Sequence, residues 1–225
     1  MSKQVYYSDI WSNFSVVAMV NTGVDPYESM EVYKNNRTLS DQILDRANRY
    51  EKANKLGLDE LPLEFFVDRG KSVKHLPEAI FANGYIVVQQ KCADIFSRFD
   101  LGQTDLVPCK ILQADRKTEL DGSYYVINFG TQKNVFLPEK SLGLRPPYEH
   151  PDGASWILPY DKENDQIAVS AAALEGPDMW HDPKIADTVF MSGALHDALK
   201  VAKLDKLFNF YSCRVVGGID HGRNW

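Results

Sequence analysis

The sequence has few cysteines, no low-complexity tract and no long apolar run, and each absence narrows its class. The three cysteines, Cys92, Cys109 and Cys213, are an odd number without CxxC spacing. They predict neither a disulfide framework nor a zinc site, and unpaired thiols are typical of the reducing cytoplasm. The varied composition indicates a folded chain rather than a disordered one.

The N-terminus lacks a secretion signal. MSKQVYYSDIWSNF contains one lysine and no apolar run of the length that a signal requires. The longest apolar stretch nearby, residues 16–20, is far shorter than a membrane span. We therefore expect a cytoplasmic protein without a membrane partner.

The common catalytic and phosphate-binding motifs are missing as well. The chain contains no GxSxG, GxxxxGK[ST], GxGxxG or HExxH. Its only glycine pair, Gly217-Gly218, is not followed by a helix that could hold an anion. Because the histidines form no cluster with metal-ligand spacing, we expect no cofactor and no metal site.

Two adjacent His–Asp pairs are the strongest catalytic candidates. His181 and Asp182 precede Pro183, which favours extended backbone at Asp182, so the two side chains should point to opposite faces. His196 and Asp197 lie in an expected helix, where adjacent side chains diverge by about 100°. A general base needs an orienting partner within about 2.6–3.2 Å. A hydrolase that uses His181 or His196 with a nearby aspartate is one hypothesis.

Negative charge is concentrated in one part of the chain. The sequence has 25 basic and 31 acidic residues, a net charge of −6. Residues 147–192 contain only Lys162 and Lys184 against nine acidic residues. This balance argues against direct nucleic-acid binding, which usually requires a basic patch. The segment is either a solvated acidic face or a surface that attracts a basic protein.

Aromatic residues are interspersed with these acids. Rings supply contact area at protein interfaces and acids supply orientation and association rate, although a single tryptophan more often lies in the core. We predict that this segment contacts a protein partner and that it does not catalyse a reaction. The predicted contact residues are Asp152, Trp156, Tyr160, Asp161, Glu163, Asp165, Glu175, Asp178, Trp180 and Asp182.

The first 75 residues predict mixed secondary structure. An apolar strand is expected at residues 14–20, with a turn at 21–23. Ser40 is a suitable N-cap for an amphipathic helix that ends near Gly57. A second strand is expected at residues 63–67, and no flexible linker follows it.

The remaining chain contains one pattern twice. Residues 85–112 and 188–216 each read as an apolar strand, an amphipathic helix and a second strand. Between them, strands are expected at 123–129, 135–137 and 166–170, and the Pro/Gly-rich residues 145–160 read as a surface loop.

These patterns predict an α+β protein with mixed sheets. The two related β-α-β units would occupy the C-terminal two-thirds of the chain. The expected organisation is an N-terminal extension, residues 1–75, packed on a duplicated domain, residues 76–225.

The second half resembles the immunity protein eleven family of bacterial polymorphic toxin systems, formerly a domain of unknown function. The resemblance rests on DMWHDPKIADTVFMSGALHDALKVAKLDKLFNF, on GSYYVINF and on YIVVQQKCADIFSRF, within about residues 80–215. It implies a cytoplasmic inhibitor that binds and neutralises a cognate toxin domain by occlusion. Immunity proteins often mask nucleases, which are basic and would suit the acidic segment. The other interpretations are the hydrolase and an adaptor or structural module of a secretion system.

Overall fold

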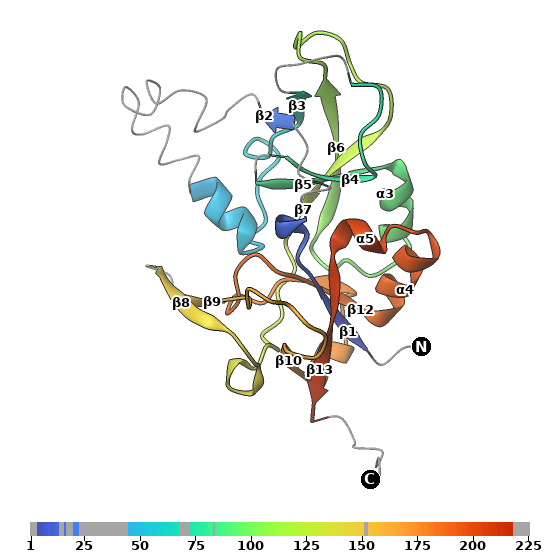
Figure 1. The fold of residues 1–225 in the computed structure, drawn as a ribbon. Coiled ribbons are helices and arrows are strands. Elements are labelled where there is room, and N and C mark those ends of the chain that lie inside the picture. Colours follow the sequence, from blue (N-terminus) through green and yellow to red (C-terminus); the bar gives the residue numbers. More distant parts are fainter. Residues whose placement is uncertain are drawn as a thin grey trace.

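The structure, a computed structural model, places strands and short helices in two stacked halves (Figure 1). It describes residues 4–13, 16, 20–22, 45–67, 73–82, 84–150 and 153–217. Each half is built around a curved mixed sheet, and the predicted α+β class is confirmed. None of the helices in the described part of the chain is both long and apolar enough to cross a membrane.

The upper half contains a six-stranded sheet in the order β2-β3-β6-β7-β5-β4. Only β3 and β6 pair in parallel. The sheet curls, because Phe81 of β4 donates its amide to the carbonyl of Val16, shortly before β2, at 2.8 Å. The strands are β2 (Val20–Thr22), β3 (Glu64–Val67), β4 (Ala79–Ala82), β5 (Tyr85–Gln89), β6 (Asp105–Leu112) and β7 (Tyr124–Asn128).

The lower half contains a five-stranded sheet in the order β10-β13-β1-β12-β11. Its central strand comes from the start of the chain, and the strand next to it comes from the end. The strands are β1 (Val5–Ser8), β10 (Ala168–Ser170), β11 (Met179–Trp180), β12 (Val189–Ser192) and β13 (Phe210–Val216). A separate two-stranded hairpin, β8 (Arg145–His150) and β9 (Gly153–Ile157), projects beside this sheet.

Helices connect the two halves on one side of the molecule (Figure 1). Helix α3 (Gln90–Phe96) packs against α4 (Gly193–Val201), and α5 (Asp205–Phe208) follows directly. Ser192 caps α4 by accepting the Leu195 amide at 3.2 Å. The described residues also contain the 3-10 turns η1 (Ile10–Ser12), η2 (Pro138–Lys140) and η3 (Ala171–Leu174).

Both predicted repeat segments fold as strand, helix and strand. In each, the two strands lie on either side of a third strand that is antiparallel to both: β7 lies between β5 and β6, and β1 lies between β12 and β13. This is a split β-α-β arrangement. That the two segments are related units stays a prediction.

The N-terminal segment contributes strands to both sheets. Strand β1 belongs to the lower sheet, whereas β2 and β3 belong to the upper sheet. The strand predicted at 63–67 is confirmed, but Asn21 and Thr22 lie in β2 and not in a turn. Residues 45–51 are helical, and Ala53, with φ of 52°, reverses the chain before Gly57. Ser40 and most of residues 14–19 lie outside the described residues.

Between the repeat segments, β7 confirms the strand expected at 123–129 and β10 part of the strand expected at 166–170. Residues 135–137 form no strand; Phe136 makes only an isolated bridge with Val169. The loop predicted at 145–160 was wrong, because β8 and β9 pair there as a hairpin.

Candidate partner-binding site

Trp180 faces the core of the protein. Its side chain is completely buried, and its ring stacks on Phe190 with centroids 5.8 Å apart. The Lys133 ammonium lies 3.7 Å from the centroid of the Trp180 ring, and it donates hydrogen bonds to the carbonyls of Glu175 and Pro177. The prediction that Trp180 contacts a partner is therefore wrong, because burial in this core stabilises the fold more than exposure would.

Asp182 is buried as well, and it holds the backbone together. Its Oδ2 atom accepts the amides of Val135 and Phe136 at 2.7 Å each, and its Oδ1 atom accepts the amide of Lys184 at 3.1 Å. These bonds tie the chain after β7 to the chain after β11. Asp182 thus has a structural role, and it cannot present its carboxylate to a partner.

His181 lies in an aromatic environment without an acidic partner. Its ring centroid is 4.4 Å from that of Phe129 and 6.2 Å from that of Trp11. Its Nε2 atom has no hydrogen-bond partner among the described residues, and only 2 % of the residue is exposed. Burial lowers its pKa to about 3, although a hydrogen bond to the Glu51 backbone opposes the shift. The ring is therefore neutral at physiological pH and shielded from solvent.

The second His–Asp pair does make contact. His196 Nδ1 lies 3.1 Å from Asp197 Oδ1, although the two side chains diverge on the helix. The His196 ring is buried because Tyr6 stacks on it at 3.6 Å between centroids and Phe210 packs edge-on. This pair meets the distance that a general base and its orienting acid require, but Tyr6 covers one face of the ring.

Asp178 also bonds within the protein. Its Oδ1 atom accepts the Ser192 hydroxyl at 2.5 Å, and its Oδ2 atom accepts the Asp100 amide at 3.1 Å. The half-buried carboxylate therefore supports the start of α4 and the turn after α3.

The thiols are equally unsuited to nucleophilic chemistry. All three cysteines are free, and burial raises the pKa of Cys92 and of Cys109 to about 12 and that of Cys213 well above its ordinary value. A thiol with a raised pKa is protonated at neutral pH and reacts slowly.

Four of the predicted contact residues come together on one surface loop. We define the acid loop as residues 158–166, which connect β9 to the strand β10. Tyr160, Asp161, Glu163 and Asp165 are all exposed on it. The other predicted residues lie elsewhere: Trp156 is half-buried in β9, Glu175 is exposed after η3, and Asp152 is outside the described residues.

The single lysine of the acid loop points inward. Lys162 Nζ lies 3.0 Å from Asp9 Oδ2, and the side chains are only 15 % and 5 % exposed. Asp9 in turn accepts the Ser12 hydroxyl at 2.9 Å. The composition of the segment predicted its negative charge, but which charges face solvent depends on this long-range ion pair.

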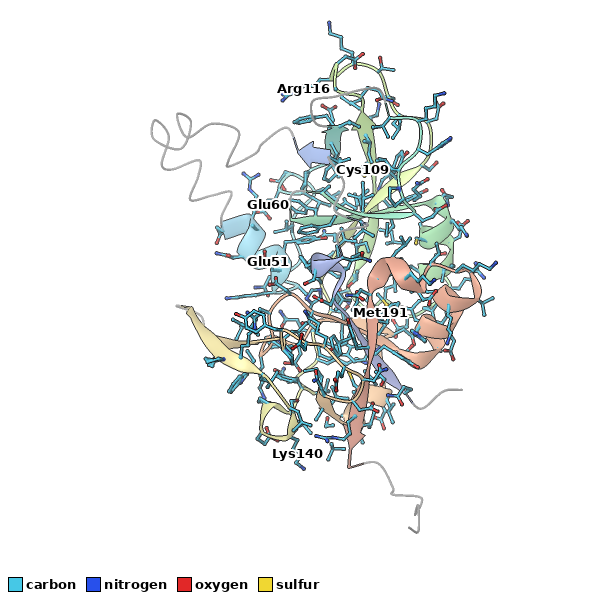
Figure 2. All side chains as sticks on the ribbon, in the orientation of Figure 1. Glu51, Glu60, Cys109, Arg116, Lys140 and Met191 are labelled. Atoms are coloured by element: carbon cyan, nitrogen blue, oxygen red, sulfur yellow. The ribbon has the colours of Figure 1, made fainter. Side chains whose placement is uncertain are left out.

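A second group of acidic side chains, which the sequence did not predict, lies in a small hollow. This hollow of about 40 Å³ lies between helix 45–51 and residues 182–187, and Glu51 and Asp187 line it together with Asn48 and Ser155. Figure 2 shows Glu51 at the lower end of this helix, above the hairpin. Desolvation first, and the charge of Asp187 second, raise the pKa of Glu51 to about 7.

The pKa of Asp187 is also raised, through desolvation first and the charge of Asp9 second, while Arg145 opposes the shift. Two carboxyl groups in such a hollow can share a proton or pair with a cation. No local sequence pattern indicates this pair, because its members are 136 positions apart. Within the described residues, no three His, Cys, Asp or Glu side chains gather as metal ligands would.

Comparison with known proteins assigns no family. No protein-family model matches the chain. A search of the curated proteins also finds no match. Membership of the immunity protein family is therefore a proposal.

Proposed function

We propose that this chain is an immunity protein that binds a cognate bacterial toxin domain and neutralises it by occlusion. The observation that carries the proposal is the acid loop, which presents Tyr160 and three carboxylates to solvent next to each other. An exposed aromatic side chain among exposed carboxylates suits recognition of a basic protein surface. The resemblance of residues 80–215 to the immunity family supports the same function.

The contacts of the first His–Asp pair support a binding role without catalysis. The carboxylate of Asp182 accepts hydrogen bonds from backbone amides, and His181 packs against aromatic rings. Both residues therefore contribute to the fold by contacts that leave neither group available to a substrate.

A hydrolase remains the second candidate because His196 and Asp197 lie in hydrogen-bond distance. This candidate requires that the Tyr6 ring moves to admit a substrate to His196. A His196→Asn variant would then lose an activity that the wild-type protein possesses. An adaptor of a secretion system would instead bind a partner that is not toxic.

The decisive experiment pairs the protein with the toxin domain encoded beside it. Mixing the two purified proteins should give one complex in size-exclusion chromatography with light scattering, and co-expression should restore growth of cells that produce the toxin domain. A toxin domain from an unrelated locus is the control and should do neither. Failure of the neighbouring toxin to bind, or binding without protection, would contradict the proposed function.

A further inference from the structure

The acid loop presents charge of one sign because its only cation is neutralised inside the protein. Lys162 pairs with Asp9 beneath the loop, while Asp161, Glu163 and Asp165 on either side of it remain exposed. If Lys162 were exposed as well, its positive charge would partly offset the negative charge of the neighbouring carboxylates. With this lysine turned inward, the three carboxylates form no ion pair with any described residue, although the Arg145 guanidinium lies over the neighbouring Tyr160 ring. The field of these exposed carboxylates attracts cations.

The loop is held in place although it contains neither a helix nor a strand. Arg145 Nε donates to the Leu158 carbonyl at 2.7 Å at its start, and the Leu142 amide donates to the Gln166 carbonyl at 2.9 Å at its end. Ser212 of β13 donates its amide to Asn164 Oδ1 at 2.8 Å. A loop fixed in advance loses little conformational entropy when a partner binds.

Asp165 supplies a further sign that this conformation is enforced. Its φ of 63° is in the left-handed region, which disfavours residues other than glycine. Its amide donates to the Ser212 carbonyl and its Oδ1 atom accepts the Ser212 hydroxyl, both at 2.8 Å. Strained backbone that the surroundings hold in place is common at functional sites. Asp165 therefore positions the loop, and its carboxylate is partly occupied.

Tyr160 completes the surface with an aromatic side chain. It is 81 % exposed, and the guanidinium of Arg145 lies 4.2 Å from its ring centroid, which restricts the orientation of the ring. Leu142, which bonds to the end of the loop, is a second exposed apolar side chain. A large ring held in position and left in solvent provides contact area at low entropic cost.

We propose that the acid loop is the surface that captures an arginine- or lysine-rich segment of the protein partner, with Tyr160 as the apolar anchor and Asp161 and Glu163 as the charged contacts. Guanidinium groups form paired hydrogen bonds with carboxylates and also stack on aromatic rings. The proposal rests on the proposed function for the identity of the partner. The chemistry of the captured segment follows from the loop alone.

The test compares two loop variants with a matched control. Tyr160→Ala removes the anchor, and Asp161→Lys with Glu163→Lys reverses two charges. Asp59→Lys with Asp121→Lys makes the same charge change at exposed acids outside the acid loop. Each loop variant should raise the Kd for the neighbouring toxin domain by about tenfold or more, and the charge reversal should act mainly by slowing association. The control should change Kd less than about threefold, and circular dichroism should show that all variants fold.

A second probe keeps the two proposals distinguishable. A short peptide of alternating glycine and arginine is titrated into the isotope-labelled protein and followed by NMR. Shifts concentrated on residues 158–166, and lost in the loop variants, support the inference even if the toxin does not bind. Shifts spread over every acidic surface, or a toxin Kd that the loop variants leave unchanged, would overturn it. In the latter case a stable toxin complex would still support the immunity function.

Discussion

Replacing Asp182 should show whether this carboxylate serves the fold or a reaction. Asp182→Ala removes the acceptor of three backbone amides, two of which belong to the buried residues Val135 and Phe136. A buried amide left without an acceptor costs about 1–3 kcal/mol. Two such amides predict a loss of about 2–6 kcal/mol in the free energy of unfolding, a large part of the 5–15 kcal/mol that is typical of a domain.

Asp182→Asn provides the matched comparison. The amide oxygen can still accept the Val135 and Phe136 amides, while the amino group faces the Lys184 amide, which loses its acceptor. We therefore expect a loss of only about 1–2 kcal/mol, since one hydrogen bond is removed and no charge is required at Oδ2.

Urea unfolding followed by circular dichroism measures both variants, and an unchanged slope of the transition shows that the unfolded state is not altered. The order wild type, Asn, Ala in stability is the expected outcome. An Asn variant as unstable as the Ala variant, or an Ala variant within about 0.5 kcal/mol of wild type, would refute the structural role. A hydrolytic activity that the Asn change abolishes would instead favour the catalytic hypothesis.

Three further changes test other parts of the structure. The pKa of Glu51 is raised from 4.5 to about 7, so its contribution to stability is intact below pH 4.5 and is lost as the pH rises to about 7. Glu51→Gln should therefore stabilise the protein in urea unfolding at pH 8 and have little effect at pH 4.5. The stabilisation at pH 8 should be smaller than for a fully buried group, because solvent screens the exposed carboxyl. An equal effect at both pH values would contradict the raised pKa. Lys162→Met leaves Asp9 buried without its cation and should lower stability by about 3 kcal/mol or more, whereas the same change at exposed Lys140, measured by the same unfolding assay, should cost under about 0.5 kcal/mol. The three thiols should react with iodoacetamide at pH 7 only after unfolding, because burial raises their pKa values; fast labelling of the folded protein, detected by mass spectrometry, would contradict this.

The elements that the sequence predicted are those with a strong local pattern. Strands β3 and β7 are short, nearly continuous apolar runs, and helix α4 has apolar residues at helical spacing. The hairpin β8–β9 was missed because its strand begins with Arg145-Pro-Pro, and proline usually indicates a loop or an edge position. Here the hairpin is separate from both sheets, so the prolines interrupt no central strand.

Local sequence patterns could not predict which side chains are buried and which face solvent. Trp180 and Tyr160 both lie beside acidic residues, yet one is completely buried and the other is 81 % exposed. The difference arises from contacts with distant segments: Trp180 packs on Phe190 and under Lys133, whereas Tyr160 carries the Arg145 guanidinium on its ring and is otherwise turned to solvent. Composition thus predicted an acidic segment, but only the tertiary contacts select which of its residues form a surface.

Those tertiary contacts also relate the acid loop to both ends of the chain. Its buried lysine pairs with Asp9, directly after β1, and its strained aspartate is held by Ser212 of β13. Strands β1 and β13 are neighbours in the lower sheet although about two hundred residues separate them in sequence. A chain without β13 lacks the Ser212 bonds, and without that strand β1 loses one of its two neighbours. The surface that we assign to partner binding therefore assembles only after the chain has been made as far as β13 and this strand has paired with β1.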